Sequence, residues 1–120
     1  MVDSESNFFQ ETLCDLRLHR DSSTHTINTS IKTLDLHSKD SELLIEQPCF
    51  YIYELAVHGS DNFVIAAGHL SFVNTLVIHS DSNIFKNLKV RHIAILGNSN
   101  YFDNCIYESL NDYGQGNEFQ

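Results

Sequence analysis

The chain has 120 residues and a mass of 13.7 kDa, which suits one domain with a single hydrophobic core. Its 16 acidic and 7 basic residues give a net charge of -9, which argues against direct binding to nucleic-acid phosphates or anionic membranes. Three cysteines without a CxxC motif, a start unlike a signal peptide and the lack of an apolar run of about 18 residues predict a reduced, cytoplasmic protein.

From residue 13 onward the chain repeats a six-residue template, apolar-x-x-apolar-x-apolar. The start-to-start spacings of its five copies are 18, 21, 21 and 17 residues. The copies begin at Leu13, Ile31, Ile52, Val73 and Val90. A polar turn of Ser, Asp, Asn and Gly follows each copy, and a second short apolar run follows most turns. This period predicts a repeat protein in which each unit buries its apolar side against its neighbours.

The residue types favour strands in both apolar segments of each unit. Val, Ile, Phe, Tyr and Thr are abundant, and apolar and polar residues alternate with period two. We therefore predict an all-β fold, a parallel β-helix (β-solenoid) of about five short coils. Two inner rows are expected, one of Leu16, Leu34, Leu55, Leu76 and Ile93 and one of Leu18, Leu36, Val57, Ile78 and Ile95. The shortest spacing predicts a tighter corner between Asn87 and Lys89.

This pattern resembles short-coil, right-handed β-helix-like repeat proteins, and more weakly it resembles leucine-rich repeats. Val90-x-x-Ile93-x-Ile95-x-x-Asn98 is similar to the L-x-x-L-x-L-x-x-N motif of the second group. That resemblance implies a leucine-rich-repeat-like α/β solenoid, which stays open as the alternative. The short coils of 17 and 18 residues and the strand-like second runs favour the β-helix.

The segments at the two ends differ from the repeat. Residues 1–12 are expected to form an N-terminal cap, residues 13–110 the β-solenoid domain and residues 111–120 a flexible tail rich in Asn and Gly. The ends of a stack of coils expose strand edges. Homodimerisation through one end of the solenoid is therefore a further hypothesis.

Alternation along the predicted strands directs a second set of side chains outward. Four units continue with histidine, which predicts a column of imidazoles spaced by about 4.8 Å, the distance between strands. Apolar side chains among the outward residues indicate a contact surface. The candidate binding surface consists of Asp35, His37, Glu54, Ala56, His58, Val77, His79, Ala94 and Leu96.

No catalytic motif is found, so neither a catalytic residue nor a cofactor is expected. We predict a non-catalytic protein-binding module, most specifically an acidic inhibitor or antagonist of a nucleic-acid-handling protein. Such a protein would imitate nucleic-acid charge, as an immunity or anti-defence protein does, and its partner would be a basic protein rather than a nucleic acid or a membrane. A self-assembling structural β-helix unit and a metal-binding module built on the histidine column are the alternatives.

Overall fold

The computed structural model describes residues 2–3, 15–46, 49, 51–66 and 72–120, and every regular element over these residues is a β-strand. Sheet A contains β1 (Val2–Asp3), β2 (Asp15–Leu18), β4 (Ile31–Leu36), β6 (Tyr51–Val57), β8 (Phe72–Ile78), β10 (Lys89–Ile95) and β12 (Ile106–Asp112). Sheet B contains β3 (Thr24–Ile27), β5 (Glu42–Ile45), β7 (Phe63–Ala66), β9 (Ile84–Lys86), β11 (Tyr101–Asp103) and β13 (Glu118–Phe119).

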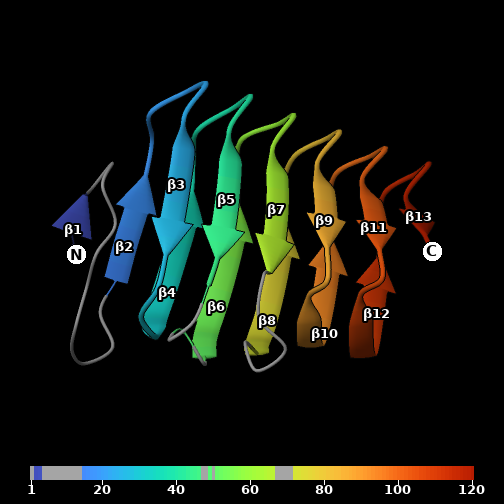
Figure 1. Cartoon of the computed structure of the whole chain (residues 1–120). Helices are drawn as coiled ribbons and strands as arrows, with labels where there is room; N and C mark the ends of the chain where they lie inside the picture. The colour runs from blue at the N-terminus through green and yellow to red at the C-terminus, as the bar shows by residue number, and fades with distance from the viewer. Residues whose placement is uncertain (1, 4–14, 47–48, 50, 67–71) are drawn as a thin grey trace.

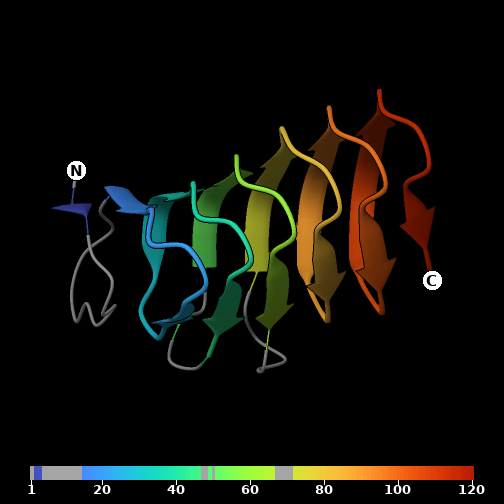
Figure 2. The same ribbon diagram turned by 90° about the horizontal axis from the view of Figure 1, so that it is seen from above.

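The chain winds into a parallel β-solenoid of about five coils, as predicted (Figure 1). From β2 onward each coil gives one strand to each sheet, and each strand pairs in parallel with the equivalent strand of the next coil. Figure 2 shows the two sheets as two walls along the stack. Because the second apolar run of each unit forms a strand of sheet B, the helical leucine-rich-repeat alternative is excluded.

The apolar core lies between the two sheets and is built from continuous rows. The registers confirm both predicted rows, and every member is 0–1% exposed. On sheet B a further row ends in stacked rings, with centroid distances of 4.8 Å for Phe85–Phe102 and 4.6 Å for Phe102–Phe119. Each unit alone has an open apolar side, so stacking in register is what removes these side chains from water.

A bend in the long strands explains why the template has two consecutive x positions between its first two apolar residues. In β4 both Ile31 and Leu34 are buried, although strict alternation would place residues three apart on opposite faces. The ladder between β4 and β6 passes from Ile31↔Ile52 to Thr33↔Glu54 and skips the position between them. The strand therefore turns there, and two successive side chains point outward.

A buried ladder of side-chain amides lines the polar turn between the two strands of each coil. The Asn62 backbone N–H donates to Asn83 Oδ1 at 3.0 Å, and the Asn83 backbone N–H donates to Asn100 Oδ1 at 2.9 Å. The same contact joins Ser41 to Asn62 and Asn100 to Asn117. These amides satisfy backbone donors that the turn would otherwise bury without partners.

The coils approach one another most closely at the start of the same turn. A Cβ atom at Gly97 would collide with the backbone carbonyl of Ser80, and Gly59 and Gly114 meet the equivalent obstacle. Further along the turn, one residue per coil has a left-handed backbone, with φ of 61° at Asp61 and 71° at Gly116. Glycine suits the close approach because it has no Cβ atom, and small polar residues and glycine occupy the left-handed position. These two requirements explain the composition of the turns.

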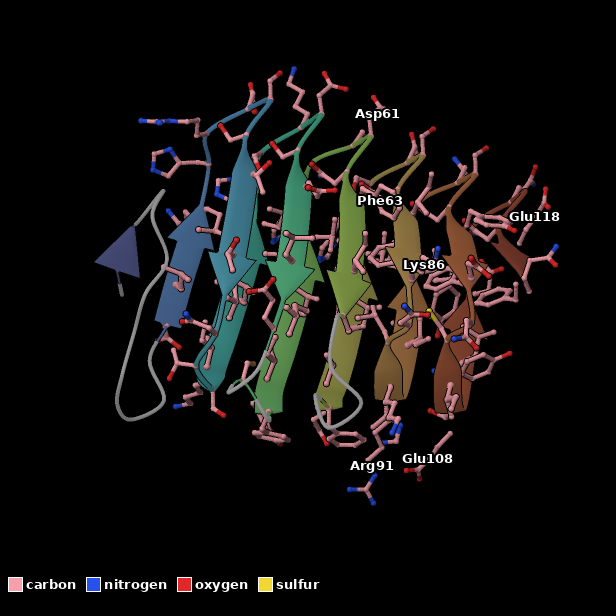
Figure 3. All side chains as sticks on the ribbon, in the orientation of Figure 1. Asp61, Phe63, Lys86, Arg91, Glu108 and Glu118 are labelled. Atoms are coloured by element: carbon pink, nitrogen blue, oxygen red, sulfur yellow. The ribbon has the colours of Figure 1, made fainter. Side chains whose placement is uncertain are left out.

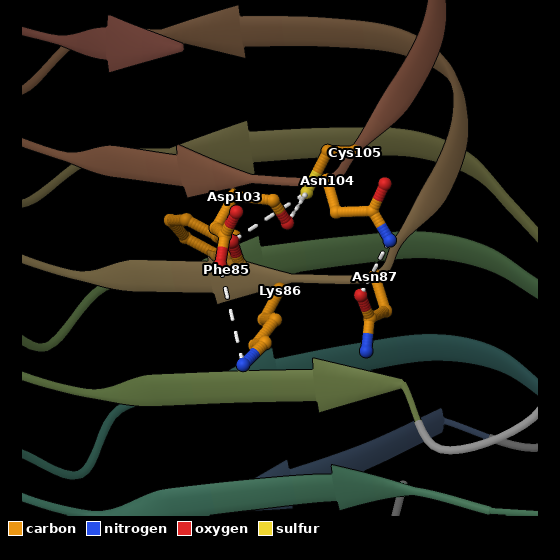
Figure 4. Close-up of polar contacts among 6 residues, drawn as sticks. All are labelled: Phe85, Lys86, Asn87, Asp103, Asn104 and Cys105. Atoms are coloured by element: carbon orange, nitrogen blue, oxygen red, sulfur yellow. Dashed lines mark hydrogen bonds and ion pairs between the residues drawn. The ribbon is translucent and has the colours of Figure 1, made fainter. Parts of the chain in front are cut away.

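The opposite corner of each coil takes up the differences in coil length. From sheet B to the first inward residue of sheet A, the chain advances from Ile27 to Ile31 in an early coil and from Ile45 to Ile52 in the next. In the two shortest coils Asn87 and Asn104 turn the chain with φ of 62° and 55°. Asn104 Nδ2 donates to Asn87 Oδ1 at 2.8 Å (Figure 4). The tighter corner predicted between Asn87 and Lys89 is confirmed.

The C-terminal segment differs from the expected flexible tail. Strand β12 runs to Asp112, β13 pairs with β11, and Asn117 continues the amide ladder. The Gly- and Asn-rich composition belongs to one more polar turn of the solenoid. Of the predicted cap at residues 1–12, only Val2–Asp3 belongs to the described residues, and it pairs in parallel with β2. The rest of the cap and Leu13 lie outside the described residues.

We expect Asn83→Ala to lower the free energy of unfolding by about 1–3 kcal/mol, because the buried Asn62 N–H loses its acceptor. Urea unfolding followed by circular dichroism measures this change. Asn98→Ala is the matched control, since Asn98 makes the equivalent contact to the Gln115 N–H on the exposed side of the turn. Its loss should stay within about 0.5 kcal/mol. Equal losses for the two variants would contradict a special role of the buried ladder.

Candidate protein-binding surface

The nine predicted surface residues follow three parallel rows along the stack on the outer side of sheet A and the adjoining turn. Glu54 lies in one row with Thr33 and Thr75. A second row holds Asp35, Ala56, Val77 and Ala94. The third row holds His37, His58, His79 and Leu96, whose backbone N–H groups make equivalent ladder contacts. The stacking of the coils thus places the predicted surface residues in three neighbouring rows.

The apolar members of the predicted surface do not form an open patch. Ala56 is only 4% exposed, and Val77 and Ala94 are partly buried. Leu96 is 51% exposed, but it belongs to the histidine row and not to the row of Ala56, Val77 and Ala94. Short side chains between longer neighbours leave little apolar area open to water. The apolar side chains that were expected to indicate a contact surface on sheet A are therefore exposed to different degrees and do not form one open patch.

The predicted histidine column is confirmed for His37, His58 and His79, three of its four members, whose rings form a parallel stack. Ring centroids are 4.3 Å apart for His37–His58 and 4.6 Å apart for His58–His79, with interplanar angles of 12° and 4°. Leu96 and Tyr113 occupy the same position in the following coils and are exposed. Burial lowers the pKa of His58 below its ordinary value, and the positive charges of protonated His37 and His79 lower it further.

The column does not have the geometry of a chelating metal site. Parallel stacked imidazoles direct their nitrogen lone pairs side by side, whereas a tetrahedral ion needs ligands that converge on one point. Among the residues that the structure describes, no group of three or more His, Cys, Asp and Glu side chains is placed to hold a metal ion. Ring stacking and proton binding are therefore the properties that this arrangement supports.

One contact between coils joins a serine to a histidine that sequence reasoning did not connect. His92 Nδ1 and Ser109 Oγ lie 2.7 Å apart on the exposed outer face of sheet A. The residues are separated by one coil length of 17, so they pair when the last spacing of the repeat is extended by one more coil. A nucleophilic serine also needs an oriented base and N–H donors for the oxyanion. The pair alone serves as a polar contact between coils.

The outer face of sheet B carries an apolar surface that the sequence analysis missed. Leu44, Phe63, Ile65, Ile84 and Tyr101 point outward there, and we call them the front patch. Ile84 is 40% exposed and the other four are partly exposed. Phe63 pairs with Ile84 and Ile84 pairs with Tyr101, so the side chains are contiguous across three coils. In Figure 3 this face, with Phe63 labelled, is turned toward the viewer.

Acidic residues lie at both ends of one row of the front patch and in the turn before it. Glu42 precedes Phe63 in its row, Glu118 follows Tyr101, and Asp61 lies exposed in the turn before Phe63 (Figure 3). Lys86 is the one base within the strands described for sheet B, and its Nζ lies 4.0 Å from Asp103 Oδ2 (Figure 4). Both side chains of this cross-coil pair are exposed, and the carboxylate places a negative charge next to the lysine. The front patch is therefore an apolar surface with an acidic rim.

The sequence contained a signal for this surface. The second runs Glu42-Leu43-Leu44-Ile45 and Phe63-Val64-Ile65-Ala66 are almost continuously apolar instead of alternating. In a strand such a run places apolar groups on both faces of the sheet. The sequence analysis considered the outward residues of the first strand of each unit only. It therefore missed the outward apolar residues of the second strand.

Comparison with known proteins gives no family: no family model, no curated protein and no solved structure matches this chain. Within the described ranges, no helix is long and apolar enough to cross a membrane.

We expect acid to destabilise the fold through His58. Its pKa in the folded state is below the ordinary value of 6.5, so the unfolded chain binds the proton more readily. Stability is therefore full above pH 6.5 and falls as the pH drops below it. The loss should be less than about 1 kcal/mol, because water screens this partly exposed column.

Urea unfolding between pH 7.5 and pH 5, pH values on either side of the ordinary histidine pKa, measures this dependence. His58→Gln should flatten the decline. His92→Gln, outside the column, should leave it in place. An unchanged slope in His58→Gln would contradict this explanation.

Proposed function

We propose that this protein is a non-catalytic protein-binding module that docks a basic protein through the front patch. The single observation that supports this proposal best is the contiguous apolar surface formed by outward side chains of β5, β7, β9 and β11. On the outer face of a sheet, apolar side chains gain stability only when another surface covers them. The interior of the solenoid is already filled by buried rows, so the outside remains for recognition.

The charges around the front patch favour a partner of opposite sign. Glu42, Asp61 and Glu118 lie beside an apolar centre, and protein interfaces commonly combine an apolar centre with a polar rim. The net charge of -9 extends this preference to the whole molecule. A basic protein would be steered toward the acidic rim, and a second copy of this acidic chain would be repelled by it.

Nucleic-acid-handling proteins are the class of basic partner that we favour. Their binding surfaces are rich in Lys and Arg, because they neutralise phosphate groups. An acidic protein that covers such a surface blocks access of the nucleic acid. In its most specific form, the proposal is therefore an antagonist of the immunity or anti-defence type that acts by occupying a nucleic-acid-binding surface.

The proposal is tested with two matched variants of an exposed aliphatic residue. Ile84→Lys places a positive charge in the front patch, and Leu96→Lys places one in the histidine row on the other side of the turn. We expect Ile84→Lys to weaken binding of the partner by about tenfold or more. Leu96→Lys should bind like the unchanged protein. Both should fold, because each site is exposed.

The partner is identified by comparing the proteins captured by the unchanged chain and by the two variants, and it is then purified. Calorimetry at rising salt measures its affinity, and competition with duplex DNA and single-stranded RNA tests antagonism. The expected affinity falls with salt and nucleic acid competes. A partner that depends on Leu96 rather than Ile84, or binding that salt does not change, would contradict the proposal. Failure of competition alone would leave a binding module that is not an antagonist.

A further inference from the structure

The last coil breaks the pattern of the inner rows at one position. Ile78 pairs with Ile95, and Ile95 pairs with Asp112, so the row that begins at Leu18 ends in a carboxylate. The row members before it are fully buried, whereas Asp112 is exposed at the open side of β12. This is the one acidic residue that occupies a position in the two predicted inner rows.

The carboxylate of Asp112 is held in place by its own coil. Asp112 Oδ1 accepts from the Gly114 backbone N–H at 3.0 Å and from Asn117 Nδ2 at 2.8 Å. Asn117 belongs to the amide ladder, so the contact connects the end of the apolar row to the polar turn. These two donors fix the charge over the end of the row.

The rest of this end has the properties of a surface on which coils stack. Phe119 stacks on Phe102 at 4.6 Å and is only partly buried, and Tyr107 and Leu110 continue other inner positions with part of their surface open. The outer edge of β12, seen at the right of Figure 1, has no strand beside it in the described part of the chain. Such an edge is a template for parallel pairing with another strand.

We propose that Asp112 keeps a second copy of this chain from stacking its coils onto β12. A coil placed on β12 would bring its own inner row over Asp112 and take the carboxylate out of water. Burying this carboxylate is more costly than burying an aliphatic side chain, because its two hydrogen-bond donors offset only part of the hydration that is lost. Inward-pointing charges at sheet edges are a known means of preventing edge-to-edge association. The rest of the end can then stay apolar without causing assembly.

Sedimentation velocity over a wide concentration range tests this inference with the full chain. The unchanged protein should sediment as a monomer of 13.7 kDa. Asp112→Leu restores the aliphatic row, and it should self-associate at a concentration lower by about tenfold or more. Asn111→Leu is the matched control, because Asn111 pairs with Ala94 in an outward row of the same strand. This control should remain monomeric.

A second variant separates the effect of losing the charge from the effect of losing the hydrogen bonds that Asp112 accepts. Asp112→Asn keeps an oxygen acceptor for Gly114 and Asn117 but removes the charge, so it should also self-associate more than the unchanged protein. Circular dichroism confirms that each variant is folded. The inference is overturned if the unchanged protein assembles as readily as Asp112→Leu. It is also overturned if both folded Asp112 variants stay monomeric, or if Asn111→Leu assembles to the same degree.

Discussion

The fold depends on one constraint, that equivalent residues of successive coils lie directly above one another. Parallel pairing at a spacing of about 4.8 Å places each side chain against its counterpart in the next coil. An aliphatic residue is then buried by the aliphatic residues on either side, as Leu55 is by Leu34 and Leu76. An amide, a ring or a small residue likewise gains stability when the next coil carries a similar residue. This explains why rows, rather than isolated contacts, organise the whole molecule.

The same constraint leaves the outward rows as the surface for the binding role that we propose. Rows that face inward fill the space between the sheets, so recognition depends on what the outward rows present. Sheet A presents polar and short side chains next to a column of stacked imidazoles, whereas sheet B presents Phe63, Ile84 and Tyr101 in one row. The proposed docking of a protein partner would use this row, in which equivalent side chains of successive coils lie beside one another.

Much of the fold could be predicted from the sequence, because period and residue type together determine which side chains share a row. The inner rows and the tight corner at Asn87 follow from the positions of Leu, Ile and Val and from one shortened spacing. The buried state of Ala56 could not be predicted, since it depends on the size of neighbours across the strands. The pairing of His92 with Ser109 follows from extending the spacing of 17 residues by one more coil, a step that the sequence analysis did not take.

The end of the chain was the least predictable part. A Gly- and Asn-rich segment is typical both of a disordered tail and of a polar turn in this solenoid, and composition alone does not separate them. What decides between them is that Asn117 and Gly114 fall at the ladder and close-approach positions of the earlier coils. Continuing the spacing of 17 residues beyond Ile93 leads to Leu110, which indicates the additional strand.

The variable corner between sheet B and sheet A has a consequence for how such a chain can change. The polar turn is held by amide contacts in every coil from Ser41 to Asn117, and the inner rows leave no room for extra residues. Only the other corner differs in length between coils, from the compact turn at Asn87 to the longer connection after Ile45. Segments can be gained or lost there without displacing a neighbouring coil, which makes it the natural place for grafted loops and for divergence between related chains.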